Sequence, residues 1–136
     1  MSNKVWLITG SARGLGRDIL EAALAAGERV LATARDLTKF ADLKATYGDN
    51  LQTFALDVTD AKAAQTAVNQ AIKSFGHLDV LVNNAGYGHF VPFEQTKAED
   101  FKAQMDTNFY GVVNLVRAAL PQMRAQKSGY IIKTLS

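Results

Sequence analysis

Cysteine is absent from the 136 residues, and histidine occurs only twice, as His77 and His89. The missing cysteines exclude a disulfide scaffold, a thiolate metal site and a cysteine nucleophile. Two histidines are too few for a histidine-rich metal site, so no metal site is expected. A large excess of one charge is also lacking, because 15 basic and 13 acidic side chains leave a formal charge of +2. That balance argues against nucleic acid or an anionic membrane as the main partner.

Long hydrophobic runs are missing as well. The first apolar run ends at Thr9-Gly10 and is too short for a signal peptide or a transmembrane span. We therefore expect no targeting segment, no membrane partner and a cytoplasmic protein. Hydrophobic residues make up 48% of the chain and charged residues 21%, which is ordinary globular usage and argues against disorder. A chain of this length has room for one domain.

Short apolar runs alternate with helical patterns along the chain. Four of the runs are almost entirely apolar, which is typical of strands covered on both faces of a parallel sheet. The third run alternates more and is expected at an edge. The predicted strands are residues 5–9, 29–34, 52–56, 79–82 and 130–134. The alternation predicts an α/β, Rossmann-like doubly wound parallel sheet of strand order 3-2-1-4-5, with ligands bound at the switch point between the first and fourth strands.

Apolar stripes at helical spacing lie between the predicted strands. Thr96 and Glu99 fit a capping box, with Thr96 as the N-cap of a helix. A longer helix is predicted over residues 108–126, with a kink at Pro121. Its apolar band is wide, which fits either a deeply buried helix or a helix that keeps surface for a second partner.

The last predicted strand has the composition of an interior strand, yet no residue follows Ser136 to cover it. An apolar edge strand is an aggregation hazard that complete proteins usually avoid. We therefore expect a sheet truncated after its fifth strand, and a sequence that is the front part of something longer.

Three glycines follow the first predicted strand in the spacing Gly-x-x-x-Gly-x-Gly. Such glycines allow a sharp turn, a close approach of backbone to ligand and tight helix–strand packing. The helix that follows offers free N–H groups to a pyrophosphate. No Lys-Ser/Thr pair follows, which disfavours an NTPase. The alternative to nucleotide binding is a tight strand-to-helix turn without a ligand. The cofactor-binding residues predicted in this loop are Gly10, Ser11, Arg13, Gly14, Leu15 and Gly16.

The end of the second predicted strand selects the cofactor. An acidic residue there would accept bonds from the adenosine ribose hydroxyls of NAD, but the sequence has Thr33-Ala34-Arg35. Arg35 and Arg13 can pair with a 2′-phosphate, because guanidinium groups suit phosphate oxygens. This pattern favours NADP(H) over NAD. Two alternatives stay open: both arginines are solvated surface charges, or Asp36 serves NAD, although Asp36 looks more like a cap of the following helix.

Two further strand ends carry candidate binding residues. Asp57 could accept a bond from the adenine amino group while Val58 packs near the ring, although Asp also starts turns and caps helices. Asn84 can tie neighbouring loops together, and Ala85 and Gly86 leave room for a flat ring or a ribose. A polar turn is the alternative interpretation of this second segment.

Together these residues resemble the short-chain dehydrogenase/reductase family. The resemblance covers the whole chain, and the motifs stand in family order and at family spacing. The matching segments are residues 9–16, Asp57-Val58, Asn83-Asn84-Ala85-Gly86, residues 107–111 around Asn108, and residues 129–136. It implies one NAD(P)-binding Rossmann domain over residues 1–136, with the glycine loop at the cofactor phosphates, Arg35 marking NADP, Asp57 and Val58 at adenine, and Asn84 beside the ribose.

The resemblance also implies two catalytic residues. Asn108 matches the active-site Asn of the family, which holds backbone and an ordered water in a proton relay. Ser136 matches the catalytic Ser that bonds the substrate carbonyl or hydroxyl. Lys133 and Leu135 depart from the Asn-x-Ser-Ser strand that is usual in the family.

The family's Tyr-x-x-x-Lys motif, which supplies the acid/base and lowers its pKa, does not occur in these 136 residues. A phenol of pKa ~10 is a poor base near neutrality without such help. The chain is therefore interpreted as the cofactor-binding portion of an NADP(H)-dependent oxidoreductase that transfers hydride to or from a small-molecule carbonyl or alcohol, with little turnover of its own. The alternatives are an inactive dinucleotide-binding fragment and, more weakly, a methyltransferase. Self-association into a homo-oligomer through the 108–126 helix is a further expectation.

Overall fold

The computed structural model describes residues 3–87 and 91–134. Its strands pair in parallel in the order β3-β2-β1-β4-β5. The strands are β1 (Val5–Ile8), β2 (Arg29–Ala34), β3 (Leu51–Ala55), β4 (Val80–Asn83) and β5 (Tyr130–Lys133). The predicted doubly wound sheet, its strand order and the edge position of the third strand are confirmed, and no predicted strand boundary differs by more than one residue.

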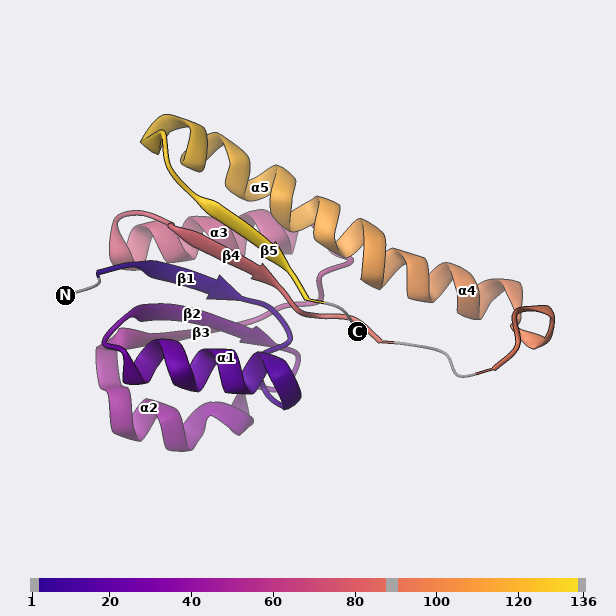
Figure 1. The fold of residues 1–136 in the computed structure, drawn as a ribbon, viewed down its shortest axis with the longest axis horizontal. Coiled ribbons are helices and arrows are strands. Elements are labelled where there is room, and N and C mark those ends of the chain that lie inside the picture. The colour runs from indigo at the N-terminus through magenta and orange to yellow at the C-terminus, as the bar shows by residue number, and fades with distance from the viewer. Residues whose placement is uncertain (1–2, 88–90, 135–136) are drawn as a thin grey trace.

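Helices cover both faces of this sheet (Figure 1). The helices α1 and α2 lie on one face, and α3 and α5 lie on the other. Their bounds are α1 (Gly14–Ala25), α2 (Ala41–Tyr47), α3 (Ala61–Phe75), α4 (Ala98–Met105) and α5 (Gly111–Gln126). Within the described residues, no helix combines the length and the hydrophobicity that crossing a membrane requires.

Side chains of the central strands alternate between two hydrophobic clusters, as the period of two in a strand requires. Leu7 of β1 packs in one cluster with Leu115 of α5. The next residue, Ile8, packs in the other cluster with Leu20 of α1. All four side chains are fully buried. Because β1 is covered on both faces, it is apolar at nearly every position instead of at every second one.

The edge strand β5 departs from this pattern. All four of its residues are exposed, with Tyr130 at 64%, Ile131 at 41% and Ile132 at 42%. The expectation that apolar strands are covered on both faces is met by β1, β2 and β4. The exposure of β5 agrees with the expected truncation of the sheet after its fifth strand, because its side chains lie outside both core clusters.

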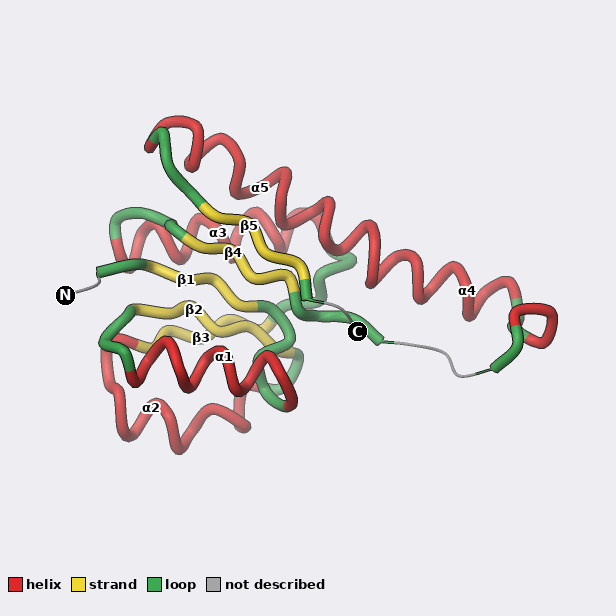
Figure 2. The backbone as a smooth tube through the Cα atoms, in the orientation of Figure 1, coloured by secondary structure: helices red, strands yellow, loops and turns green. Residues whose placement is uncertain are grey.

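The helix α4, a π-helical turn over Asp106–Tyr110 and α5 follow one another without a break. Figure 2 shows this long helical segment reaching beyond the carboxyl ends of the strands. The helix predicted over residues 108–126 is therefore present, but helical structure begins earlier, at Ala98. It continues through Pro121 to its end at Gln126.

The capping box predicted at Thr96 is wrong. The helix α4 begins after Lys97, which makes no side-chain capping bond. The hydroxyl of Thr96 instead donates to the carbonyl of Pro92 at 3.3 Å. Thr96 ends the short 3₁₀ helix η3 (Phe93–Gln95), so its hydroxyl is turned backwards along the chain and away from the helix that follows.

Replacing Leu115 by Ala should lower the free energy of unfolding by about 3 kcal/mol, within the range for a deleted core leucine. Leu115 is fully buried between α5, α3 and the sheet. The control is Leu120→Ala on the same helix, where the leucine lines an outward-facing groove and the loss should stay below about 1 kcal/mol. Urea unfolding measures both variants, and equal losses would contradict the assignment of inner and outer faces.

Candidate cofactor site

A cleft of about 820 Å³ opens at the carboxyl ends of β1, β2, β3 and β4. The loops that follow these strands line it. The predicted residues that it brings together are Gly10, Arg13, Gly14, Arg35, Asp57, Val58, Asn84, Ala85 and Gly86. The chain leaves β1 towards β2 on one side, while β4 neighbours β1 on the other. The cleft therefore lies at the switch point of the sheet, where open α/β sheets bind ligands.

Three predicted binding residues of the glycine loop lie outside the lining of this cleft. Ser11 is fully buried, and its hydroxyl lies 3.2 Å from the Ile8 carbonyl and 3.1 Å from the Thr33 carbonyl. Gly16 is buried behind the loop, whereas Leu15 is 53% exposed. The structure thus gives the Ser11 side chain a place in the scaffold that joins β1 to β2.

Contacts around the glycines account for their spacing. Gly10 has a φ of 60°, and a Cβ there would lie 2.8 Å from Cα of Ala85. A Cβ on Gly16 would overlap the Gly10 carbonyl oxygen and Nδ2 of Asn84. Around Gly14, with a φ of 61°, no atom of the described residues lies within 4 Å of such a Cβ. The first and third glycines therefore allow close packing, while the second presents bare backbone to open space.

Hydrogen bonds join the glycine loop to the ends of β4 and β5. The hydroxyl oxygen of Thr9 accepts from the N–H groups of Asn84 and Ala85, at 3.0 and 3.1 Å. Nδ2 of Asn84 donates to the Gly10 carbonyl at 3.0 Å, and the Thr134 hydroxyl donates to Oδ1 of Asn84 at 2.7 Å. Asn84 thus ties two loops together, as its sequence position suggested. Thr9 and Thr134 were not among the predicted site residues; the place of Thr9 directly before the first glycine was the available signal.

Two carboxylates at the cleft are each engaged by a turn. Asp57 accepts from the backbone N–H of Thr59 at 3.0 Å and from its hydroxyl at 2.7 Å, and these bonds lower the pKa of Asp57. Asp36 accepts from the Thr38 hydroxyl at 2.6 Å and from its N–H at 3.0 Å, which lowers the pKa of Asp36. Asp36 is the N-cap of η1 (Leu37–Phe40). The interpretation of Asp36 as a cap is therefore confirmed.

Three cationic side chains lie at the same cleft. Arg13, Arg35 and Lys39 line it beside Asp36 and Asp57, which leaves the lining with a formal charge of +1. Lys39 was not predicted, because it lies five residues beyond the end of β2. The short helix η1, whose N-cap Asp36 was indicated by the sequence, brings Lys39 back to the rim, but no sequence motif marks Lys39 itself.

Asn108 lies in the π-helical turn and holds the loop that follows β4. The N–H of Tyr87 donates to Oδ1 of Asn108 at 2.9 Å, and Nδ2 of Asn108 donates to the Tyr87 carbonyl at 2.5 Å. Both ends of the carboxamide are therefore used on one backbone unit. Tyr87 and Thr107 line the cleft, so the two hydrogen bonds between Asn108 and Tyr87 fix one of its walls. The other residue predicted to be catalytic, Ser136, lies outside the described residues.

The chain matches a known protein family over almost its whole length. The family model described as short chain dehydrogenase matches residues 4–136. The chain belongs to this family. Its relatives include the oxidoreductase BOA17 of Botryotinia fuckeliana (strain B05.10), which is 44% identical over 134 residues, or 98% of this chain and 49% of that protein.

Solved structures of dehydrogenases have the same fold. A short-chain dehydrogenase from Streptomyces avermitilis matches with a TM-score of 0.92 at 41% identity, over 98% of this chain and 49% of that one. An alcohol dehydrogenase from the archaeon Thermococcus sibiricus, complexed with 5-hydroxy-NADP, matches with a TM-score of 0.90 at 29% identity, over 99% of this chain and 59% of that one. This chain therefore spans about half the length of the relatives that it matches.

Replacing Gly16 by Ala should lower the free energy of unfolding by about 1–3 kcal/mol, as expected for overpacking at a tight contact. The added methyl group would overlap the Gly10 carbonyl and the Asn84 amide. Ala25→Ser, which adds one atom at an exposed position of the same helix, is the control and should change stability by about 0.5 kcal/mol or less. Chemical denaturation measures both, and a Gly16→Ala protein as stable as the control would rule out the close approach.

Proposed function

We propose that this short-chain dehydrogenase binds NADP(H) in the cleft at the carboxyl ends of β1 to β4. The observation that carries the proposal is the open backbone at Gly14, directly where α1 begins and beside Arg13 and Arg35. The first N–H groups of a helix have no partner within it, and together with the helix dipole they favour a pyrophosphate. The residues present therefore fit the diphosphate bridge of a nicotinamide dinucleotide.

The adenosine end of the cofactor would lie between the ends of β2 and β3. Arg35 and Arg13 would bind the 2′-phosphate as guanidinium forks, while Val58, which is 6% exposed, would border the adenine beside Asp57. Asp36 is engaged as the cap of η1, which favours NADP(H) over NAD. The NADP derivative named for the Thermococcus sibiricus structure supports this choice.

The whole protein is proposed to be an oxidoreductase acting on a small-molecule carbonyl or alcohol. The cofactor supplies the hydride chemistry. The loop of Asn84, Ala85 and Gly86 would border the nicotinamide ribose, and Asn108 would hold that loop in place through the Tyr87 backbone. Ser136 would donate a hydrogen bond to the substrate oxygen.

Replacing Arg35 by Asp should weaken NADPH binding by at least roughly 10- to 100-fold, the range for a lost hydrogen bond to a charged group, and should strengthen NADH binding. NADH has no 2′-phosphate for Arg35 to bind, and a carboxylate at the end of β2 can accept bonds from its ribose hydroxyls. Lys73→Asp, a reversal of charge near the C-terminal end of α3, is the control and should alter neither affinity. Isothermal titration calorimetry measures both ligands, and an unchanged ratio of affinities in Arg35→Asp would refute the specificity.

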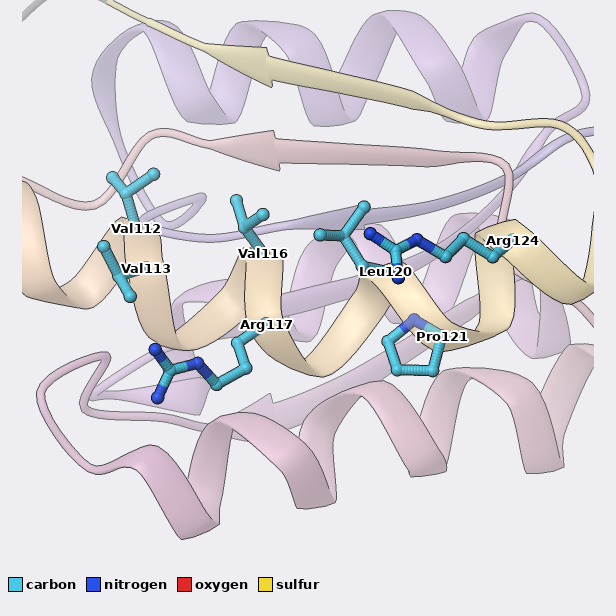
Figure 3. Close-up of a pocket in the computed structure, with 7 residues that line it drawn as sticks. All are labelled: Val112, Val113, Val116, Arg117, Leu120, Pro121 and Arg124. Carbon is cyan, nitrogen blue, oxygen red and sulfur yellow. The ribbon is translucent and has the colours of Figure 1, made fainter.

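We also propose that two copies of the chain pair through the outer face of α5. This face holds a shallow groove of about 440 Å³ (Figure 3). Apolar side chains form most of it, flanked by two arginines: the lining consists of Val112, Val113, Val116, Arg117, Leu120, Pro121 and Arg124. An identical helix face suits a two-fold axis, because both partners then present the same self-complementary surface.

Val113→Asp, in the same groove but outside both core clusters, should weaken this pairing by ~3 kcal/mol, the lower end of the cost of an unpaired charge in an interface, and so shift the chain from dimer to monomer. Sedimentation velocity over a concentration series measures the shift. The control is Ile131→Asp on the exposed strand β5, which should leave the dimer intact. Loss of association in Ile131→Asp alone would place the interface on the sheet edge instead, and a monomeric unmutated chain would refute pairing altogether.

A further inference from the structure

We infer that Lys39 is a third recognition residue for the 2′-phosphate, and that Arg17 is the positioning residue that holds Lys39 at the rim of the cleft. The inference rests on the proposed NADP(H) site and adds two residues to it. Neither residue belongs to the glycine motif or to the strand end that suggested the cofactor.

Arg17 links α1 to the segment that carries Lys39. Its Nη1 donates to the Lys39 carbonyl at 2.8 Å, and its Nη2 donates to Oδ2 of Asp42 at 2.6 Å. Its Nε donates to Oε2 of Glu21 at 3.2 Å. The Arg17 side chain is only 18% exposed. One guanidinium therefore holds a residue of its own helix, a carboxylate of α2 and the backbone of η1 at once.

This arrangement differs from an ordinary surface ion pair, which contributes little because two long side chains must be ordered in water. The planar guanidinium has its donors in a fixed fork, so three acceptors in different directions define its position. One of those acceptors is the main-chain carbonyl of Lys39. The η1 turn is thereby held at both ends, by the Asp36 cap at its start and by Arg17 near its finish.

The charge of the cleft explains why Lys39 matters for this ligand. Without Lys39, the two arginines of the lining would face the two carboxylates Asp36 and Asp57, and the formal charge would be zero. A phosphate monoester carries a charge of about −1.5 to −2 at neutral pH. Lys39 therefore makes the lining positive. Because a lysine is a point charge on a flexible stem, its effect depends on where the backbone is held, which is the role of Arg17.

The test titrates NADPH and NADH into the 136-residue chain by calorimetry, for Lys39→Gln, Arg17→Gln and the exposed control Lys73→Gln. Lys39→Gln should weaken NADPH binding about three- to tenfold, as for a partly exposed charged contact, and should leave NADH binding unchanged. Arg17→Gln should act in the same direction. The double variant should lose less than the product of the two single losses, because both residues act on one contact. Lys73→Gln should change neither affinity.

A second variant, Arg17→Lys, keeps the charge but loses the fork, and should reproduce the selective loss of NADPH affinity. Unchanged NADH affinity shows that the pocket of each variant is folded. If the unmutated chain prefers NADPH but Lys39→Gln behaves like Lys73→Gln, the inference is overturned and the proposed function stands. If the Arg17 variants weaken both ligands equally, the positioning role is overturned. If the unmutated chain shows no preference for NADPH, the proposed function fails and this inference fails with it.

Discussion

The cleft depends on one close approach, in which the backbone of Gly16, the carbonyl of Gly10 and the amide of Asn84 meet with no room for another carbon atom. That contact brings the first turn of α1 against the end of β4. It also aims Asn84 at the Gly10 carbonyl, while Thr9 receives the N–H groups on the other side. The loop is therefore held tightly at Gly10 and Gly16, while the backbone at Gly14 between them faces open space.

The charges at the cleft are a second feature of the site. Asp36 and Asp57 accept hydrogen bonds within the turns that they start, so both carboxylates stabilise the backbone that follows β2 and β3. Their negative charges nevertheless remain at the cleft and would repel a phosphate. The cations Arg13, Arg35 and Lys39 reverse that balance. The positive charge of the rim is thus shared among three side chains, and no single arginine accounts for it.

The two outer apolar surfaces of the molecule have different structural origins. The face of α5 belongs to a helix whose opposite side, around Leu115, is packed into the core, and its half-buried valines extend an apolar band that is wider than one cluster needs. The side chains of β5 lie outside both clusters, whereas the other edge strand, β3, keeps Leu51 fully buried. A solved short-chain dehydrogenase about twice as long shares the fold of this region, so the same fold occurs within a larger protein.

The sequence by itself determined the strands, their order, the glycine loop and the charges at the strand ends, because these follow from local periodicity, from glycine geometry and from the rules of parallel sheets. Tertiary structure decided the rest. In the folded chain Ser11 is buried beside the carbonyls of Ile8 and Thr33. The Thr96 hydroxyl bonds the Pro92 carbonyl, and Lys39 lies at the rim of the cleft. Each of these outcomes depends on which distant or preceding group a side chain meets. Short-range patterns report the tendency of a residue to bond, but only the folded chain supplies its partner.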